Sequence, residues 1–323
     1  MREIDVAIVG AGPTGLFAAY YAGFRGLSTA MIDALPEPGG QVTAMYPEKM
    51  IFDVAGFPAI KGRDLVANLV EQAAQFNPTY LLGMRAVELS YVDDKPTLAL
   101  SNGETLHCGA ILITGGLGSF TSRPLPAADA FPGEGIVYFV PHLDDHAGHD
   151  VVIVGGGDSA FDWALALSPL AKSVTLIHRR DKFRAHASTV TKVRSLPVEI
   201  IVNSEVSRVL GDGKVTGVEV TPKGGGDVRT LPADTVVAAL GFTADLGPIA
   251  QWGLDLDKRH IKVDSTMATN RPRVFAAGDI TEYLGKVRLI ATGFGEAATA
   301  VNNAAIVIDP SAHLFPGHSS DAG

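Results

Sequence analysis

Cysteine is the residue type that this chain lacks most clearly, because Cys108 is the only one among 323 residues. A single thiol cannot form an intramolecular disulfide, a CxxC redox pair, a cysteine-ligated iron–sulfur cluster or a multi-cysteine zinc site. The sequence therefore excludes dithiol redox chemistry within one chain. Cys108 precedes the apolar run 110–113 and is expected to be a small buried hydrophobe, with a redox-active thiol as the alternative.

Long apolar runs and an excess of positive charge are also missing. No stretch approaches the roughly 18 uninterrupted apolar residues of a membrane span, and segment 1–10 lacks the layout of a signal peptide. The net charge of −9, from 26 Lys and Arg against 35 Asp and Glu, argues against nucleic acid, whose phosphates require a basic face. We therefore expect a cytoplasmic protein that binds neither membranes nor nucleic acid.

Aromatic residues are few, at 7% of the chain, whereas glycine is abundant, with 36 residues. Short apolar runs rich in β-formers alternate with segments of helix length, which is typical of parallel α/β architecture. The runs expected to be strands are Val6–Val9, Thr29–Ile32, Ile111–Thr114, Val151–Val154, Val174–Ile177, Thr235–Leu240 and Val274–Ala276. Glycines gather at the ends of these runs, where loops of a parallel sheet bind ligands.

A coarse internal repeat divides the chain. Segments Ile4–Gly15 and Asp150–Ala160 each pass from an apolar strand into a glycine turn and then a helix. Their spacing is far longer than a solenoid period and indicates two related domains. The segment Gly115–Pro126, rich in Gly, Pro and Ser, and a second break near Gly241–Asp245 mark the boundaries.

These boundaries predict an α/β fold with two Rossmann-like dinucleotide-binding domains. One domain is discontinuous and comprises residues 1–118 and 242–323. The other, residues 119–241, is inserted into it. The cofactor of each domain follows from its glycine loop and from the residues after its second strand.

The first glycine loop has the G-x-G-x-x-G spacing at a strand-to-helix junction. Such a loop lets the backbone approach a pyrophosphate and directs a helix N-terminus at it. An acid ends the second strand 23 residues after the first glycine, where it can accept hydrogen bonds from the hydroxyls of an adenosine ribose. The alternative is that the glycines only allow close packing of helix on strand. The residues assigned to this site are Gly10, Gly12, Pro13, Thr14, Gly15 and Asp33.

The second glycine loop carries a basic sequence where the first has its acid. Counting the same 23 residues from its first glycine reaches His178, which Arg179 and Arg180 follow. Guanidinium groups bind a 2′-phosphate bidentately, so this domain is predicted to bind NADP rather than NAD. The alternative is a solvated basic turn. The residues assigned to the NADP site are Gly155, Gly157, Asp158, Ser159, His178, Arg179, Arg180 and Arg184.

The third part of the chain adds a second acid at a strand end. Asp279 closes the run Val-Phe-Ala-Ala-Gly-Asp and can bind the ribityl hydroxyls of a flavin, or alternatively can act only as a helix cap or turn acid. The glycine-rich segment 291–298 is expected to begin a helix whose positive end stabilises a reduced, anionic flavin. FAD in one domain and NADP(H) in the other indicate a flavin-dependent oxidoreductase.

Taken together, the motifs resemble a known family. GAGPTG, PEPGGQ (36–41), GGGDSA, HRRDKFRA (178–185) and FAAGD occur in this order in thioredoxin-reductase-like flavoproteins, and the resemblance covers nearly the whole chain. True thioredoxin reductases carry a CxxC just before the second glycine loop. Here segment 135–142 has no cysteine, which removes the thiolate that disulfide exchange requires. The chain more closely resembles the thioredoxin-reductase-like branch of ferredoxin–NADP⁺ reductases, in YFV, in GGGDSAFDWAL and in a tail containing His-Ser-Ser.

The resemblance implies specific FAD contacts. Tyr46 is expected to stack on one face of the flavin, and His318 on the other face from the partner subunit of a homodimer. On the residues alone, Tyr46 as ordinary core and His318 as an ordinary tail residue remain alternatives. No side chain is expected to act as acid, base or nucleophile. The implied FAD contacts are Thr14, Asp33, Gln41, Tyr46, Ala86, Phe120, Asp279 and Ser319 or Ser320.

The function that this resemblance implies is that of a ferredoxin–NADP⁺ reductase. Electrons would pass between NADP(H) and ferredoxin through FAD, by hydride transfer at flavin N5 and single-electron steps. Two alternatives remain: an NADPH-dependent diaphorase that reduces flavins or quinones, and a nucleotide sensor that holds FAD without turnover. A polar loop of acids and imidazoles is expected to face solvent and to bind no metal: His142, Asp144, Asp145, His146 and His149.

Overall fold

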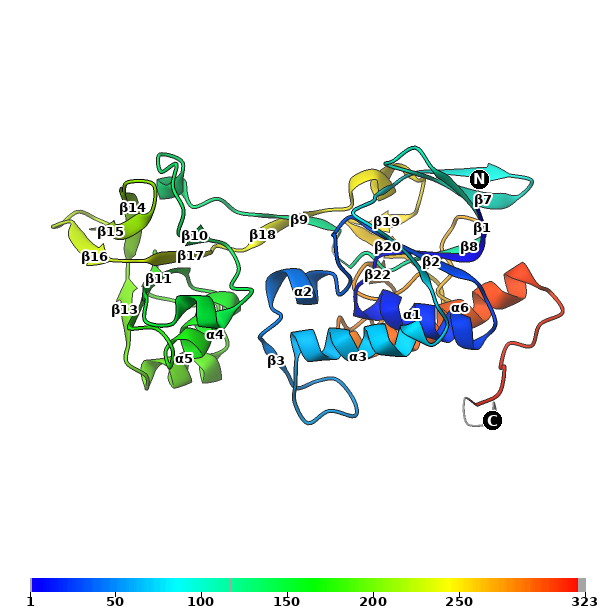
Figure 1. Cartoon of the computed structure of the whole chain (residues 1–323), viewed down its shortest axis with the longest axis horizontal. Coiled ribbons are helices and arrows are strands. Elements are labelled where there is room, and N and C mark those ends of the chain that lie inside the picture. The colour runs from blue at the N-terminus through cyan, green and yellow to red at the C-terminus, as the bar shows by residue number, and fades with distance from the viewer. Residues whose placement is uncertain (1, 117, 319–323) are drawn as a thin grey trace. The chain divides into compact units, whose positions relative to one another are not determined.

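The computed structural model describes residues 2–116 and 118–318, and contacts divide the chain into two units. The first unit contains the residues up to Phe120 and those from Ala244 onward, and the second contains Thr121–Thr243. The boundaries expected from the sequence are 118/119 and 241/242. The chain passes between the units in β9 (Ser119–Ser122) and β18 (Phe242–Asp245), which pair as a two-stranded sheet (Figure 1).

The first unit is built on a seven-stranded sheet with the order β5-β2-β1-β8-β7-β6, in which β21 also pairs with β8. Its strands are β1 (Arg2–Val9), β2 (Thr29–Asp33), β5 (Thr79–Leu82), β6 (Ala86–Val92), β7 (Lys95–Leu100), β8 (Thr105–Ile113) and β21 (Val274–Ala276). Its helices are α1 (Pro13–Phe24), α2 (Gln41–Met45), α3 (Gly62–Ala74) and α6 (Ile290–Ile308). Short strands complete it: β3 (Met50–Ile51), β4 (Ile60–Lys61), β19 (Leu256–Asp257), β20 (His260–Lys262) and β22 (Thr281–Glu282).

The parallel strands of the first unit end together. Val9 of β1 is in register with Ile32 of β2 and with Ile113 of β8. The residues that follow these strands therefore meet at one edge of the sheet, where open α/β sheets bind ligands.

Both faces of this sheet are covered. Along β1, Val6 and Ile8 pack with α1, α3 and α6 on one face, whereas Ala7 and Val9 pack on the other face with β7 and the segment around Trp252. The strands are continuously apolar because both of their faces are buried. The three helices lie along one side of β1, β2 and β8 (Figure 1).

The second unit has its own parallel sheet, with the order β10-β17-β11-β12-β13. The strands are β10 (Ile136–Val137), β11 (Asp150–Gly155), β12 (Ser173–His178), β13 (Val198–Val202) and β17 (Thr235–Ala239), and the helices are α4 (Asp158–Leu167) and α5 (Ala187–Arg194). A three-stranded antiparallel sheet follows: β14 (Ser204–Gly211), β15 (Val215–Pro222) and β16 (Arg229–Pro232). Val154 of β11 is in register with Ile177 of β12 and Ala238 of β17.

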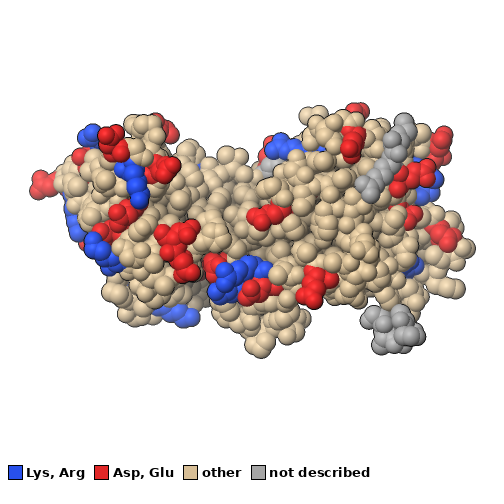
Figure 2. Space-filling model, in the orientation of Figure 1, with Lys and Arg blue, Asp and Glu red and all other residues tan. Residues whose placement is uncertain are grey.

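The architecture confirms the predicted fold class, with a Rossmann-like strand–loop–helix in each unit. Every predicted strand is present, and only Thr114 and Leu240 lie just beyond a strand end. Among the helices of the described residues, none is long and apolar enough to cross a membrane. On the face drawn in Figure 2, Lys and Arg lie interspersed with Asp and Glu, so both signs of charge are spread over that face.

Candidate functional site

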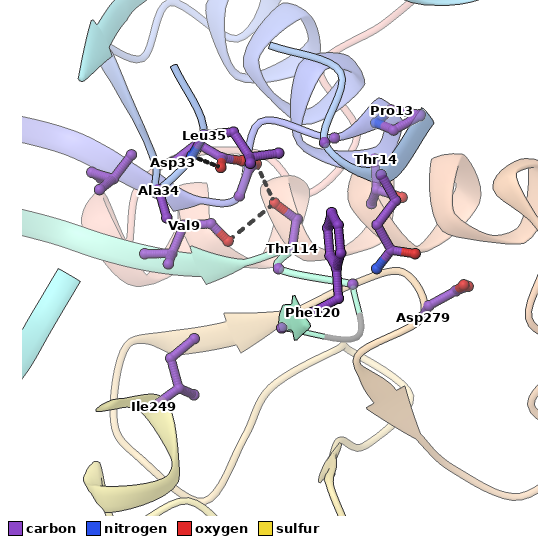
Figure 3. A pocket seen from close by; sticks show the side chains of 18 of the residues that line it. Val9, Pro13, Thr14, Asp33, Ala34, Leu35, Thr114, Phe120, Ile249 and Asp279 are labelled. Atoms are coloured by element: carbon purple, nitrogen blue, oxygen red, sulfur yellow. Dashed lines mark hydrogen bonds between the residues drawn. The ribbon is translucent and has the colours of Figure 1, made fainter. Parts of the chain in front are cut away.

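A cavity of about 340 Å³ lies in the first unit, at the carboxyl ends of β1, β2 and β8 (Figure 3). Segments far apart in the sequence converge on it, because parallel strands end at a common edge. The residues that line it are Val9, Gly10, Gly12, Pro13, Thr14, Ile32, Asp33, Ala34, Leu35, Gly40, Gln41, Val42, Tyr46, Met84, Arg85, Ala86, Thr114, Gly115, Gly116, Gly118, Phe120, Leu246, Pro248, Ile249, Asp279, Leu289 and Ile290.

The glycine loop forms one wall of the cavity. Gly10 has φ +119°, and a Cβ there would lie 2.6 Å from the carbonyl carbon of Thr114, so only glycine fits. The hydroxyl of Thr114 donates to the Gly10 carbonyl at 2.7 Å, as Figure 3 shows, and fixes the loop against β8. Gly12 caps α1 in an extended conformation and has open space where a Cβ would stand. The α1 N-terminus is therefore accessible to an anion.

The carboxylate of Asp33 is bound by backbone N–H groups, one of them from the first glycine loop. The Ala11 N–H donates to Oδ2 at 2.7 Å, and the Leu35 N–H donates to Oδ1 at 2.9 Å (Figure 3 draws the Leu35 bond). Burial raises the pKa of Asp33, while these backbone N–H groups oppose the rise. Each carboxylate oxygen retains acceptor capacity toward the cavity. A ribose hydroxyl pair would supply the missing donors.

The Pro-Gly-Gly-Gln segment before α2 packs onto the same loop. The Gly39 N–H donates to the Ala11 carbonyl at 2.8 Å. A Cβ at Gly40 would lie 3.1 Å from the Gly12 Cα, so the two loops touch through backbone. Gln41 begins α2, and its Nε2 lies 3.4 Å from where a Gly116 Cβ would be. This segment therefore places the Gln41 amide in the wall of the cavity.

Tyr46, Phe120 and Asp279 line the cavity from three separate segments. Figure 3 shows the Phe120 ring among the lining side chains and Asp279 at their edge. Burial raises the pKa of the Tyr46 phenol, and the carboxylates of Asp279 and Asp53 raise it further, so the phenol stays neutral. Two aromatic rings beside a carboxylate suit a planar ring system that carries a polyhydroxyl chain.

The first turn of α6 completes the cavity. Leu289 is the N-cap of α6 and Ile290 its first residue, and both line the cavity. Unsatisfied N–H groups at a helix N-terminus favour negative charge. The predicted glycine-rich helix start is therefore present and directed at this site.

Most of the sequence-predicted FAD residues meet in this cavity. Those that line it are Gly10, Gly12, Pro13, Thr14, Asp33, Gln41, Tyr46, Ala86, Phe120 and Asp279. Gly15 does not line the cavity. A Cβ there would lie 2.0 Å from the Gly10 carbonyl oxygen, so Gly15 allows α1 to pack closely against the glycine loop. The ring of His318 is exposed and contacts Phe315 at 5.1 Å between centroids. Ser319 and Ser320 lie outside the described residues.

Sequence reasoning missed part of the wall. Met84 and Arg85 follow β5, and their position at the carboxyl edge of a parallel strand is the signal that could have identified them. Leu246, Ile249 and Leu289 carry no comparable local signal. Only the tertiary fold brings them to the cavity.

The second unit repeats the loop geometry in its own sheet. Gly157 caps α4 in an extended conformation and, like Gly12, has open space where a Cβ would stand. Gly155 packs against the Ala239 carbonyl, 2.4 Å from where its Cβ would be. The exposed side chains of Asp158 and Ser159 begin α4. The predicted second glycine loop is therefore a second anion-accessible helix N-terminus.

His178 lies over this loop. A Cβ at Gly156 would lie 2.3 Å from the His178 ring, so the imidazole occupies the space that only glycine leaves free. Burial lowers the pKa of His178, and the cations Arg179, Arg180 and Arg184 lower it further, although a backbone bond with Lys182 opposes this. The imidazole therefore covers the loop in its neutral form and does not add a positive charge.

The basic segment after β12 is tied to the glycine loop. The Arg184 N–H donates to the Gly156 carbonyl at 2.8 Å, and the His186 N–H donates to Asp158 Oδ1 at 2.8 Å. The side chains of Arg179, Arg180 and Arg184 are exposed. The fold thus supplies cations beside a phosphate-accessible loop, while Asp158 is engaged by backbone.

Cys108 is buried in β8, and burial raises the pKa of its thiol to about 12. A thiol with that pKa stays protonated at neutral pH and is a poor nucleophile. The geometry therefore agrees with the expectation of a small buried hydrophobe.

Comparison with known proteins places these features in context. The family described as pyridine nucleotide-disulphide oxidoreductase matches residues 4–304. A ferredoxin–NADP reductase of Salinispora tropica is 74% identical over 321 residues, which are 99% of this chain and 99% of that protein. A ferredoxin–NADP reductase of Saccharopolyspora erythraea is 64% identical over 322 residues, covering 99% of this chain and 98% of that one.

Solved structures agree with the two-unit architecture. The thioredoxin reductase of T. acidophilum gives a TM-score of 0.77 at 28% identity and covers 96% of this chain and 99% of its own. The thioredoxin reductase of Lactococcus lactis gives a TM-score of 0.77 at 25% identity, over 94% of this chain and 99% of its own. The likeness extends over both units.

Proposed function

The chain belongs to the pyridine nucleotide-disulphide oxidoreductase family, and on that premise we propose that it is an FAD-dependent ferredoxin–NADP⁺ reductase. The observation that carries the proposal is the convergence of the first glycine loop, Asp33, Tyr46 and Asp279 on one cavity. Relatives named for this activity are 64% and 74% identical over nearly the whole chain. The resemblance inferred from the motifs is thereby confirmed.

The missing dithiol separates this chain from its structural neighbours that are named thioredoxin reductases. Cys108 is the only cysteine, is buried and has its pKa raised to about 12. Reducing equivalents therefore cannot leave through a protein disulfide. A one-electron carrier needs no dithiol in the protein that reduces it, and the names of the relatives give ferredoxin as that carrier.

The wall of the first cavity fits FAD group by group. The open α1 N-terminus at Gly12 suits the pyrophosphate, and the buried, partly satisfied carboxylate of Asp33 suits the adenosine ribose. Asp279 would bind the ribityl hydroxyls, while Tyr46 and Phe120 would flank the ring system. When bound, FAD supplies two-electron exchange with NADP(H) and one-electron exchange with a carrier.

The work of the protein in the first unit is positioning and electrostatics. The apolar residues Leu246, Ile249 and Leu289 exclude water from the cavity, and the α6 N-terminus favours negative charge there. No acid, base or nucleophile is required of the side chains. The orientation of the bound cofactor and the electrostatic field around it would set the rate, as is usual for cofactor enzymes.

The second unit would bind NADP(H). The open helix N-terminus at Gly157 suits a pyrophosphate, and the exposed guanidinium groups of Arg179 and Arg180 suit the 2′-phosphate. A carboxylate at the equivalent position, such as Asp33 in the first unit, would repel that phosphate. The pairing of one acidic and one basic ribose site supports FAD in the first unit and NADP(H) in the second.

Anaerobic stopped-flow spectroscopy tests the proposal directly. Full-length protein is mixed with NADPH or NADH and then with oxidised ferredoxin, while flavin absorbance is followed. We expect rapid bleaching by NADPH, slower bleaching by NADH and reoxidation by ferredoxin. Reoxidation only by quinone or oxygen would indicate a diaphorase, and a flavin that NADPH does not bleach would indicate a sensor.

A homodimer and a cytoplasmic location are the finer parts of this proposal. The resemblance assigns His318 to the flavin of a partner subunit, and in the single chain its ring lies against Phe315 instead. NADPH is supplied in the cytoplasm, which favours that location. Light scattering coupled to gel filtration should give twice the chain mass of 33.8 kDa, and His318→Ala should change the flavin spectrum only if the tail reaches a flavin.

A further inference from the structure

Two oppositely charged side chains are buried in the first unit, away from the glycine loop. Lys286 lies between β22 and α6, and its Nζ is 2.5 Å from Oε1 of Glu296, which lies in α6. The side chains are only 1% and 5% exposed. Removing both charges from water is costly unless their remaining hydrogen-bonding groups find partners. Those partners indicate what the pair does.

The pair binds both polar groups of one backbone residue. Glu296 Oε2 accepts the Gly278 N–H at 2.7 Å, and Lys286 Nζ donates to the Gly278 carbonyl at 2.9 Å. The Tyr283 hydroxyl donates to Glu296 Oε1 at 2.6 Å, and the Thr281 hydroxyl donates to the Gly278 carbonyl at 2.8 Å. The contacts of the pair therefore converge on Gly278, the residue directly before Asp279.

Gly278 is confined on its other side as well. It has φ +85°, and a Cβ there would lie 2.9 Å from Thr14 Oγ1. A Cβ at Gly293 of α6 would lie 2.4 Å from the same oxygen and 3.4 Å from the Gly278 Cα. The turn is pressed between the first turns of α1 and α6. Its conformation, and with it the direction of the next side chain, is fixed from both sides.

We propose that the buried Lys286–Glu296 pair is a clamp on the Gly278–Asp279 turn, which positions the Asp279 carboxylate for the ribityl chain of FAD. The proposal rests on the proposed function in that it takes FAD as the occupant of the cavity. Among the described residues that line the cavity, Asp279 is present and the two clamp residues are not. Lys286 and Glu296 are therefore positioning residues that act through the turn.

The two members of the pair have opposite electrostatic effects on Asp279. Burial raises the pKa of Asp279, the ammonium of Lys286 opposes that rise, and the carboxylate of Glu296 adds to it. The role assigned to the pair is therefore to orient the Asp279 carboxylate. A well-packed apolar pair can replace a buried ion pair with little loss of stability, so stability alone does not explain its presence.

The double variant Lys286→Met/Glu296→Leu removes both charges and leaves neither one buried alone. In full-length protein we expect the unfolding temperature to fall by a few degrees, because the Gly278 N–H and the Tyr283 hydroxyl lose their acceptor. FAD release should be about tenfold faster, measured by recovery of flavin fluorescence. Asp279→Asn should accelerate release in the wild type and add little in the double variant. Independent, multiplicative effects of the two changes would overturn the clamp.

The exposed pair Arg288–Glu282 is a matched control from the same loop. Its atoms are 2.5 Å apart, and its side chains are 34% and 31% exposed. The control variant Arg288→Gln/Glu282→Gln should release FAD at the wild-type rate. An equal acceleration in both double variants would show a general loop effect and contradict the proposal.

A measurement on the wild type covers the case in which the double variant does not fold. Hydrogen exchange of the Gly278 amide in the holoprotein should be slow, because its N–H is bound to a buried carboxylate. Rapid exchange would overturn the clamp without any substitution. If the wild-type protein holds no FAD, the proposed function fails; if it holds FAD and the double variant releases it at the normal rate, only the clamp fails.

Discussion

The two glycine loops of this chain share one backbone design and differ in the side chains that complete them. Gly12 and Gly157 cap α1 and α4 with ψ of −178° and −179°, and each has open space in place of a Cβ. The pyrophosphate half of a dinucleotide site is thus built from backbone alone and can be repeated in different sequence contexts. This half identifies the ligand class but not the ligand.

The second half of each site is made by the last residue of the second strand and the residues that follow it. In the first unit, Asp33 is buried and bound by the N–H groups of Ala11 and Leu35. In the second unit, His178 lies over Gly156 and exposed arginines follow it. A buried acceptor selects ribose hydroxyls, whereas solvated cations select a phosphate. Under the proposed function, the comparison assigns the choice between FAD and NADP(H) to one strand end in each unit.

The largest expected effects on ligand binding come from placing a side chain at Gly12 or at Gly157, one variant at a time. Gly12→Val and Gly157→Val place a side chain where each loop is empty, on a backbone that valine can adopt. Gly12→Val should weaken FAD binding about 100-fold or more and leave NADPH binding intact, and Gly157→Val should do the reverse. Flavin absorbance of the purified variants and calorimetric titration with NADPH measure both. If each variant weakened both ligands, the loops would not be independent sites.

Removing the cations of the second unit should have a smaller, selective effect. Arg179→Gln/Arg180→Gln removes two exposed guanidinium groups. The affinity for NADPH should fall about 10- to 100-fold while NADH binding is unchanged, because only NADPH carries the 2′-phosphate. Steady-state KM values for the two nucleotides report the difference. Lys192→Gln, on the same unit, serves as the charge control, and equal losses for NADPH and NADH would refute the phosphate assignment.

The acid of the first unit predicts a pH dependence. Burial raises the pKa of Asp33 above its ordinary value of 3.8. Ribose hydroxyls donate more strongly to the ionised carboxylate than to the protonated acid, in which one oxygen has become a donor. The affinity for FAD should therefore be highest at neutral pH and should fall by about tenfold as the pH drops through this raised pKa. FAD release measured from pH 7 downward tests the sign. Asp33→Asn should lower the affinity at neutral pH and remove this dependence; a wild-type profile without any fall would contradict the role of Asp33.

The smallest effect is expected from Cys108, which belongs to neither site. Cys108→Ala leaves a small cavity in β8 and should cost about 1 kcal/mol of unfolding free energy. Binding of both nucleotides and turnover with ferredoxin should be unchanged. Chemical denaturation and steady-state assays measure the two quantities. A loss of activity without a loss of stability would restore a redox role for the thiol.

The main elements could be predicted because their signals are local. The strands from Val6–Val9 to Val274–Ala276 are apolar runs bounded by turn residues, and all are present. The short pairs β3–β4 and β19–β20 were not predicted. Strands of two or three residues carry no periodicity of their own and form only where tertiary contacts bring their partners together.

The candidate site divides in the same way. Asp33 and Asp279 could be identified because each follows an apolar strand at a defined spacing from glycine. Ile249 and Leu289 line the same cavity. They could not be identified from the sequence, because an aliphatic residue in a loop has no distinguishing neighbour. The sequence could not identify Lys286 and Glu296 as a pair either, because only burial distinguishes them from solvated charges.

The sequence by itself determined the two glycine loops, the acidic and basic strand ends and the exclusion of dithiol chemistry. Each depends on residue type at a fixed spacing along one strand–loop–helix unit, so it is set by local geometry. Only the tertiary structure decided that Tyr46, Phe120 and Asp279 share one cavity, that His178 covers Gly156 and that a buried ion pair binds Gly278. Those relations join segments that are distant along the chain, and they exist because parallel strands end together and close packing buries what lies between them.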